Sequence, residues 1–322
     1  MPTSFLMVRP SNLLGIFTME KKYPKLIKIF NTNYLRTSYD VNGIAEQKFQ
    51  EAELVYNEKG LLVKETHFNN QNAIESIAVH EYNDDNLVIL SSQFDENNEL
   101  CQKNIFQYNK NKKIVKKSCF YGLESPEYAT IYVYENEQLM REDSYDEDQF
   151  AFTEKQYAYN ESNLMIRQLE YDEDGNVLYE TCFDYNDKGL VCKQIRNEVM
   201  QKDRRTYIFE YDEANHKIKD LIYNFKDALI AKTYYLYDDN GNVAETEEEN
   251  LDIYRKTRYT YENNNCVKAE QLDKNEALMI WSEYEYNDQN NVTVIKNYIT
   301  DEVDPTLFRI ASTIQYETEW YD

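Results

Sequence analysis

A tandem repeat of about 26 residues runs through most of this 322-residue chain and constrains its fold more than any other feature. The repeat is aligned on the second tyrosine of an aromatic-x-Tyr pattern that is followed by an acidic residue or Asn. Successive tyrosines are 24 to 26 residues apart over ten units, a register that chance does not hold. These tyrosines are Tyr56, Tyr82, Tyr108, Tyr134, Tyr159, Tyr185, Tyr211, Tyr237, Tyr261 and Tyr286.

A second, weaker aromatic series lies halfway between these tyrosines. Because of it, the structural step is about 13 residues, which is the length of one strand and one turn. The 26-residue unit is therefore predicted to contain two strands. The series consists of Phe68, Phe94, Phe120, Tyr145, Tyr171, Tyr223 and Tyr298.

Turn signals between the aromatic residues support the same unit. An aromatic residue is followed by Asp, Asn or Glu and, three residues later, by Gly or Asn, as in Tyr39–Gly43, Tyr185–Gly189 and Tyr261–Asn265. The first polar side chain can bond its own turn, and the last position favours Gly or Asn because it needs a positive φ. This pattern predicts a type I turn closed by a left-handed residue, which joins antiparallel strands.

The segments between turns alternate as β-strands do, so that the two aromatic residues of each Tyr-x-Tyr share one face and the other face is wetter. We predict an all-β chain, with a long antiparallel β-meander of about 20 or more strands from these 26-residue hairpin repeats. A sheet of that length must twist, and it is expected to form a curled or spiralling sheet. Residues 21–322 are predicted to form this single domain, and residues 1–20 a disordered extension.

Three of the units resemble the YD repeat of RHS-type proteins. They are Tyr171-Asp-Glu-Asp-Gly-Asn-Val, Tyr185-Asn-Asp-Lys-Gly-Leu and Tyr237-Asp-Asp-Asn-Gly-Asn-Val. In that family, Y-x-Y-D-x-x-G units build a long, spiralling sheet, and the resemblance covers about residues 39–300. It implies a YD-repeat fold, and small acidic proteins with such repeats resemble immunity proteins encoded beside bacterial polymorphic toxins.

The charge balance limits the partners of the chain. With 59 Asp and Glu against 35 Lys and Arg, the formal net charge is -24. Nucleic acid and anionic membrane surfaces are therefore not expected as partners, because phosphate neutralisation needs clustered Lys and Arg. Five widely spaced cysteines without a C-x-x-C pair and no clear signal peptide favour a cytoplasmic setting.

Standard catalytic signatures are missing from the sequence. It contains no G-x-S-x-G, H-E-x-x-H, Walker or G-x-G-x-x-G motif. His67 and His80 lie on neighbouring predicted strands, but no third metal ligand accompanies them. We therefore expect no enzyme activity, no cofactor and no metal.

Four acidic clusters are the candidate partner-binding residues. They could be solvated turn and edge residues, or a negative surface that steers and docks a basic protein. The second interpretation predicts an immunity or antitoxin protein that neutralises a basic bacterial toxin or effector domain through an acidic, Tyr-rich surface. The candidate residues are Asp146, Glu147, Asp148, Asp172, Glu173, Asp174, Asp238, Asp239, Glu245, Glu247, Glu248 and Glu249.

Two alternatives remain open from the sequence. Exposed aromatic ladders would suit a carbohydrate- or cell-wall-binding module, and a curled sheet around cargo would suit an RHS-like structural scaffold. The sequence also leaves open the identity of the partner, which face or edge binds it, whether the sheet closes and the oligomeric state.

Overall fold

The computed structural model describes residues 23–36, 44–122, 125–148, 150–301 and 307–321. In these residues the chain forms 22 β-strands and no helix, so the prediction of an all-β repeat fold is confirmed. No helix in this part of the chain is long and apolar enough to cross a membrane. The predicted extension 1–20 and the predicted turn Tyr39–Gly43 lie outside the described residues.

The strands follow one another at the predicted step of about 13 residues. They are β1 (Pro24–Arg36), β2 (Ile44–Tyr56), β3 (Leu62–Phe68), β4 (Ile74–Tyr82), β5 (Val88–Phe94), β6 (Leu100–Tyr108), β7 (Ile114–Phe120), β8 (Tyr128–Glu135), β9 (Gln138–Asp146), β10 (Ala151–Tyr159), β11 (Met165–Tyr171), β12 (Val177–Tyr185), β13 (Val191–Glu198), β14 (Asp203–Tyr211), β15 (Lys217–Tyr223), β16 (Leu229–Tyr237), β17 (Val243–Asn250), β18 (Tyr254–Glu262), β19 (Asn265–Leu272), β20 (Leu278–Tyr286), β21 (Val292–Thr300) and β22 (Phe308–Trp320).

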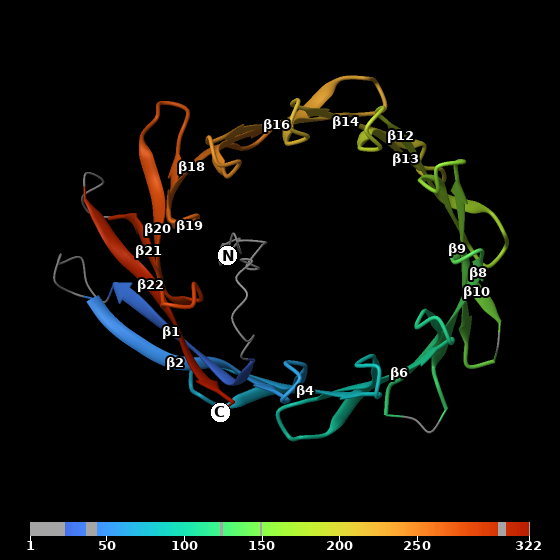
Figure 1. Ribbon diagram of the computed structural model, residues 1–322, viewed down its shortest axis with the longest axis horizontal. Coiled ribbons are helices and arrows are strands. Elements are labelled where there is room, and N and C mark those ends of the chain that lie inside the picture. The colour runs from blue at the N-terminus through green and yellow to red at the C-terminus, as the bar shows by residue number, and fades with distance from the viewer. Residues whose placement is uncertain (1–22, 37–43, 123–124, 149, 302–306, 322) are drawn as a thin grey trace.

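The sheet closes on itself, which corrects the expectation of a curled or spiralling sheet and answers the question of closure that the sequence left open. Each strand pairs antiparallel with the next, and β1 also pairs antiparallel with β22 in a register that runs from Pro24↔Trp320 to Asn33↔Ser312. The result is a closed barrel that appears as a ring when viewed along its axis (Figure 1). Both terminal strands are 13 residues long, so each covers the backbone groups that the other would leave unpaired at a sheet edge.

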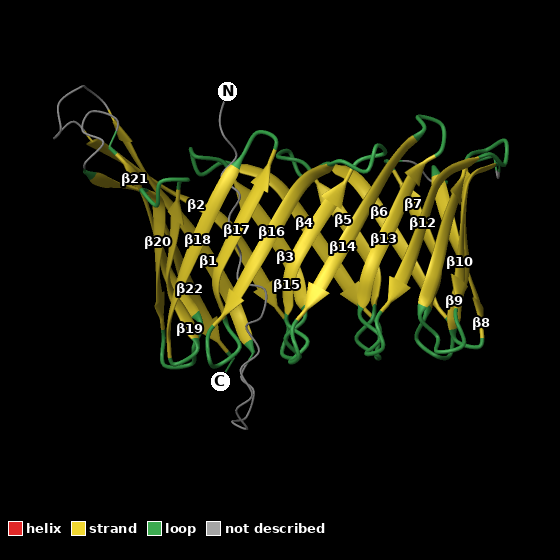
Figure 2. Cartoon of the chain, turned by 90° about the horizontal axis from the view of Figure 1, so that it is seen from above, coloured by secondary structure: helices red, strands yellow, loops and turns green. Residues whose placement is uncertain are grey.

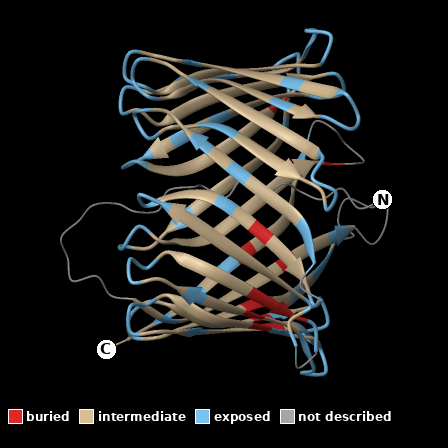
Figure 3. Ribbon diagram, turned by 90° about the vertical axis from the view of Figure 1, so that its right-hand side faces the viewer, coloured by how far each residue is buried: buried red, intermediate tan, exposed pale blue. Residues whose placement is uncertain are grey.

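The wall of this ring is a single layer of sheet (Figure 2). Most strand residues are half-buried, and the buried apolar residues among those described are few (Figure 3). The accessible surface is 21320 Å², whereas a compact monomer of this mass would expose about 14,000 Å². Stability must therefore come from the ladders and side-chain contacts within the sheet, since the described residues form no second layer on either face.

The hairpin turns have the predicted type I geometry with a left-handed closing residue. At the turn after β12, the Asn186 side-chain oxygen accepts the N–H groups of Lys188 and Leu190, each at 3.0 Å. Gly189 has a φ of +77° and donates its N–H to the Asn186 carbonyl at 2.9 Å. The adjoining register shift between Asp184 and Tyr185 marks a β-bulge, the usual companion of this turn.

Several connections depart from this rule, and two of them, after β8 and β18, have two left-handed residues each. One of these two corrects a sequence prediction. The predicted turn Tyr261–Asn265 is wrong at its end, because Asn265 already belongs to β19 and the left-handed residues are Asn263 and Asn264. Asn136 and Glu137 form the same kind of two-residue connection between β8 and β9. A tight turn with two positive φ angles takes two residues instead of five, which shortens the repeat at these units.

The repeated tyrosine has a structural role that explains why it is not phenylalanine. In eight of the ten units its hydroxyl donates a hydrogen bond to a backbone carbonyl at or next to the start of the preceding strand; in seven of these the carbonyl lies 20 residues earlier in the chain. Tyr82 reaches the Leu62 carbonyl at 2.7 Å, and Tyr185 reaches the Met165 carbonyl at 2.6 Å. Each bond therefore ties one hairpin turn to the next. The other six are made by Tyr108, Tyr159, Tyr211, Tyr237, Tyr261 and Tyr286.

The two aromatic series lie on opposite faces of the sheet. Phe94 pairs with Ile77 in β4, and strand alternation places Ile77 on the face opposite to Tyr82. Phe120 likewise pairs with Lys103, opposite to Tyr108. The expectation that one face would carry the rings and the other would be wetter is therefore only half right, because the halfway series supplies rings to the second face. We call the side of the Tyr-x-Tyr pairs the tyrosine face.

Removal of a single tyrosine hydroxyl should weaken the fold. We expect Tyr185→Phe to lower the free energy of unfolding by about 1 kcal/mol, because the Met165 carbonyl loses its partner. Urea denaturation measures the difference. Tyr223→Phe is the matched control, because the Tyr223 hydroxyl makes no hydrogen bond to another described residue. Equal losses in the two variants would contradict the role of the hydroxyl.

Alkaline pH should unfold the ring. Burial raises the pKa of Tyr261 and of Tyr284 to about 12, and also raises the pKa of Tyr185. Because the unfolded chain ionises its tyrosines near pH 10, this stabilisation is complete below about pH 10 and is lost as the pH rises toward 12. Urea midpoints measured from pH 8 to 11.5 should fall above pH 10, and less steeply for Tyr284→Phe. A midpoint that stays constant across this range would contradict the prediction.

Candidate functional site: an acidic furrow at one rim

The loops of the ring gather at two rims (Figure 2). The first rim carries the loops that follow even-numbered strands, and the second rim carries the loops that follow odd-numbered strands. The tyrosine hydroxyl bonds lie at the first rim, where the turns are regular. The second rim has more varied loops, and the candidate site lies beside it.

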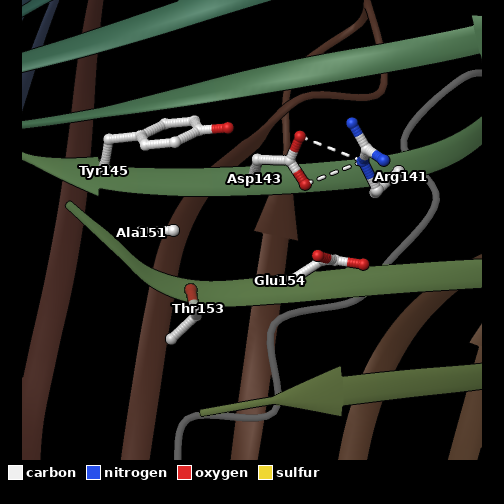
Figure 4. A pocket seen from close by; sticks show the side chains of 6 residues that line it. All are labelled: Arg141, Asp143, Tyr145, Ala151, Thr153 and Glu154. Carbon is white, nitrogen blue, oxygen red and sulfur yellow. Dashed lines mark hydrogen bonds and ion pairs between the residues drawn. The ribbon is translucent and has the colours of Figure 1, made fainter. Parts of the chain in front are cut away.

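A shallow furrow runs from β9 across β10 to the end of β11 and the loop that follows it, near the second rim. Its first part, of about 120 Å³, is lined by Arg141, Asp143, Tyr145, Ala151, Thr153 and Glu154 (Figure 4). Its second part, of about 330 Å³, shares the last three of these residues and adds Gln156, Tyr171, Asp172, Glu173 and Gly175. We call this continuous feature the acidic furrow.

Strand register places Glu154 at the centre of the acidic furrow. In β10 it lies directly opposite Asp143 of β9 and directly opposite Tyr171 of β11. Since residues that pair across antiparallel strands share a face, the three side chains are neighbours. A bulge between Ala151 and Thr153 lies next to them. The furrow is on the face opposite to the Tyr157–Tyr159 pair, because Glu154 and Tyr157 differ by an odd number of residues.

The carboxylates of the acidic furrow outnumber its cations. Nε of Arg141 lies 2.9 and 3.0 Å from the two oxygens of Asp143, a buried residue with only 6% of its surface exposed. Asp172 accepts the backbone N–H of Asn176 at 2.7 Å, and these turn contacts lower the pKa of its carboxyl group. Glu154 accepts the amide of Gln156 at 2.5 Å. Together with Glu173, the furrow is lined by four carboxylates and one guanidinium.

This arrangement favours a cationic group as ligand. Like charges directly opposite each other on neighbouring strands, as Asp143 and Glu154 are, destabilise a sheet. An ammonium or guanidinium group placed between Glu154 and Tyr171 would relieve that repulsion and could contact the ring face as well. In the part of the chain that the structure describes, no group of three His, Cys, Asp or Glu residues is arranged to hold a metal ion.

Two of the four acidic clusters predicted from the sequence lie at this place. Asp146 ends β9, Glu147 and Asp148 follow it in the loop to β10, and Asp172, Glu173 and Asp174 lie in the next loop of the same rim. Asp172 and Glu173 line the acidic furrow. Asp146 instead accepts the N–H of Phe150 at 2.8 Å within its own turn, while Glu147 and Asp148 are exposed.

The other two clusters lie elsewhere. Asp238 and Asp239 are in a turn of the first rim, where Asp238 accepts the N–H groups of Asn240 at 2.9 Å and Asn242 at 2.8 Å. The acids of β17 are half-buried within the sheet and mostly engaged by its own cations. Glu245 contacts Lys256 at 3.1 Å and Arg258 at 2.8 Å, Glu249 contacts Lys232 at 2.9 Å, and Glu248 lies 3.8 Å from Arg255. Glu247 pairs across the strands with Lys256.

Sequence reasoning missed the central residues of the acidic furrow. Arg141, Asp143 and Glu154 sit in ordinary strand positions, and the short run Arg141-Glu142-Asp143 is not among the predicted clusters. Only the cross-strand register reveals that Asp143 and Glu154 face each other. The signal could have been found by pairing β9 with β10, but the register shift beside Thr153 cannot be read from the turn sequence, which lacks the usual Gly or Asn.

Comparison with known proteins identifies no family. No protein-family model matches the chain, and no curated protein matches it. Among solved structures it is similar to a porin-like protein from Bacteroides uniformis, with 9% identity, a TM-score of 0.34, and coverage of 91% of this chain and 97% of that one. It is also similar to a TcdB2–TccC3 chain, with 10% identity, a TM-score of 0.24 and 90% of this chain covered. This chain spans 22% of the length of that TcdB2–TccC3 chain.

The ion pair of the furrow should be needed for stability. We expect Arg141→Ala to lower the free energy of unfolding by roughly 1–3 kcal/mol, because it leaves the buried Asp143 carboxylate without its cation beside Glu154. Urea denaturation measures this loss. The double variant Arg141→Ala/Asp143→Asn should recover part of it, since the buried charge is removed. No recovery in the double variant would contradict the electrostatic explanation.

Proposed function

We propose that this protein is a non-catalytic binding protein that holds a basic polypeptide, and that it acts as an immunity or antitoxin protein against a basic bacterial toxin or effector domain in the cytoplasm. The observation that carries the proposal is the pairing of Asp143 with Glu154 across β9 and β10, with Glu173 and Asp172 beside them and only Arg141 to offset their charge. A binding protein needs such a cation-deficient site, and a fold selected only for stability would avoid it.

The acidic furrow suits a Lys or Arg side chain of a partner. Its carboxylates can accept charge-assisted hydrogen bonds, and Tyr171 offers a ring whose hydroxyl bonds Gln156 at 3.4 Å. The exposed acids Glu147, Asp148 and Asp174 surround the furrow and would steer a basic protein toward it. Binding of this kind weakens as salt is added.

The acids of β17 are assigned a structural role in this proposal. Glu245, Glu248 and Glu249 each have a cation of a neighbouring strand within 4 Å, so a partner would have to displace it. The ring shape supports a second candidate, an RHS-like scaffold that surrounds cargo, because the wall is one closed layer. A cargo contact would then fall on the tyrosine face or its opposite over many strands, and would not depend on one furrow.

Affinity capture from native lysate, at low and at high salt, tests the proposal with two matched variants. Glu154→Gln/Glu173→Gln removes two furrow charges, whereas Glu249→Gln/Glu248→Gln removes two charges of β17. We expect a basic protein to elute with the native chain and to be lost with the furrow variant and at high salt, but not with the β17 variant. Loss with the β17 variant alone, or capture that ignores both salt and the furrow, would contradict the proposal.

The single variant Glu154→Gln should be more stable than the native chain. Glu154→Gln removes the repulsion between directly opposed carboxylates, which is worth roughly 0.2–1 kcal/mol in urea denaturation. A gain in stability together with a loss of binding is typical of residues retained for function. If Glu154→Gln destabilised the fold instead, the carboxylate would have a structural role and the assignment of the furrow would be wrong.

A further inference from the structure

Exposed apolar side chains collect at one rim of the ring. Of the 18 large hydrophobic residues that are exposed among those described, 15 lie in the loops of the second rim or at the strand ends beside it. The other three are Ile166, Tyr234 and Leu236, and none of these lies in a loop. The 15 are Leu35, Ile74, Leu100, Tyr121, Phe150, Phe152, Val199, Met200, Phe225, Leu229, Leu251, Ile253, Met279, Leu307 and Phe308.

Four of these residues project from loops in one arc of the rim. Leu251 is 82% exposed, Phe150 70%, Met200 68% and Phe225 52%. They lie in the loops after β17, β9, β13 and β15, respectively. Successive loops of one rim are two strands apart, which is about 10 Å across the sheet. Large apolar side chains that are exposed at the tips of turns do not stabilise the fold by burial. A row of them is therefore typical of an interaction surface. We call these four residues the apolar arc.

The apolar arc is continuous with the acidic furrow. Phe150 is next to Ala151 of the furrow, and the loop of Asp172, Glu173 and Asp174 lies between the tips of Phe150 and Met200. The matching turns of the first rim carry polar tips, such as Asp187-Lys188 after β12 and Asp239-Asn240 after β16. The exposed apolar side chains and the acidic furrow therefore lie together at the second rim, whereas the tyrosine hydrogen bonds lie at the first rim.

We propose that the second rim is a docking edge for a cationic amphipathic polypeptide, whose apolar face covers the apolar arc and whose basic residues enter the acidic furrow. This inference rests on the proposed function and names the surface that performs it. Charge complementarity selects the occupant. An anionic lipid surface would be repelled by Glu147, Asp148 and Glu173, and a second copy of this chain would bring the same carboxylates against themselves.

Fluorescence anisotropy with three synthetic peptides of equal length tests the proposal. The first peptide is helical and rich in Leu and Lys, the second carries the same Lys with Ser in place of Leu, and the third carries the same Leu with Glu in place of Lys. We expect the Leu–Lys peptide to bind best, and Phe150→Ser/Met200→Ser/Phe225→Ser/Leu251→Ser to weaken its binding at least about tenfold, which is 1.4 kcal/mol. Leu236→Ser/Ile166→Ser is the control away from this rim and should bind as the native chain does.

The outcomes separate this inference from the proposed function. In one outcome, binding of the Lys–Ser peptide requires Glu154 and Glu173, but the quadruple variant binds the Leu–Lys peptide normally. The proposed docking edge is then wrong, whereas the acidic furrow remains supported as the binding site. If no cationic peptide binds, both fail. Tighter binding of the Leu–Glu peptide would overturn the charge argument. A dimer that the quadruple variant abolishes in analytical ultracentrifugation, or flotation with phosphatidylcholine vesicles, would assign the edge to another occupant.

Discussion

The hydrogen bond from eight of the ten repeated tyrosines to a carbonyl at or next to the start of the preceding strand is the interaction on which the ring depends. A single-layer sheet has no second layer to fix the relative positions of its hairpins, so each hairpin must be tied to its neighbour by contacts within the sheet. The bond of Tyr185 to the Met165 carbonyl, repeated in seven other units of the chain, supplies that tie. Each bond contributes about 1 kcal/mol, and the repetition makes their sum large.

These bonds all lie at one rim and leave the other rim free to vary. At the first rim, an Asn or Asp caps nearly every turn and a left-handed residue closes it. At the second rim, the loops carry the large apolar side chains of Met200 and Leu251 and the acids of the furrow. The ring thus separates the contacts that hold it together from the residues that are available to a partner. This division follows from the direction of the strands, because only even-numbered strands end in the repeated tyrosine.

Much of the fold could be predicted from the sequence because its signals are local. The alternation of Tyr235, Leu236 and Tyr237 fixes a strand, and the run from Tyr185 to Gly189 fixes a turn. Closure could not be predicted, since it depends on the pairing of β1 with β22, almost 300 residues apart. The site was predicted in part. Asp172 and Glu173 lie in an acidic turn that the sequence shows, whereas Glu154 is recognised as a site residue only from its cross-strand partners Asp143 and Tyr171. The acids of β17 formed the longest run, but cations of the adjacent strands engage most of them.

Closure of the sheet is the central claim, and hydrogen–deuterium exchange of the two terminal strands tests it most directly. In a closed ring, every amide of Ile27–Asn33 and of Ser312–Gln315 lies between two neighbouring strands. The peptides that cover these segments should then exchange as slowly as those of β12 and β13 in the middle of the chain. If alternate amides of both segments exchanged at once while β12 and β13 stayed protected, β1 and β22 would be free edges and the sheet would be open.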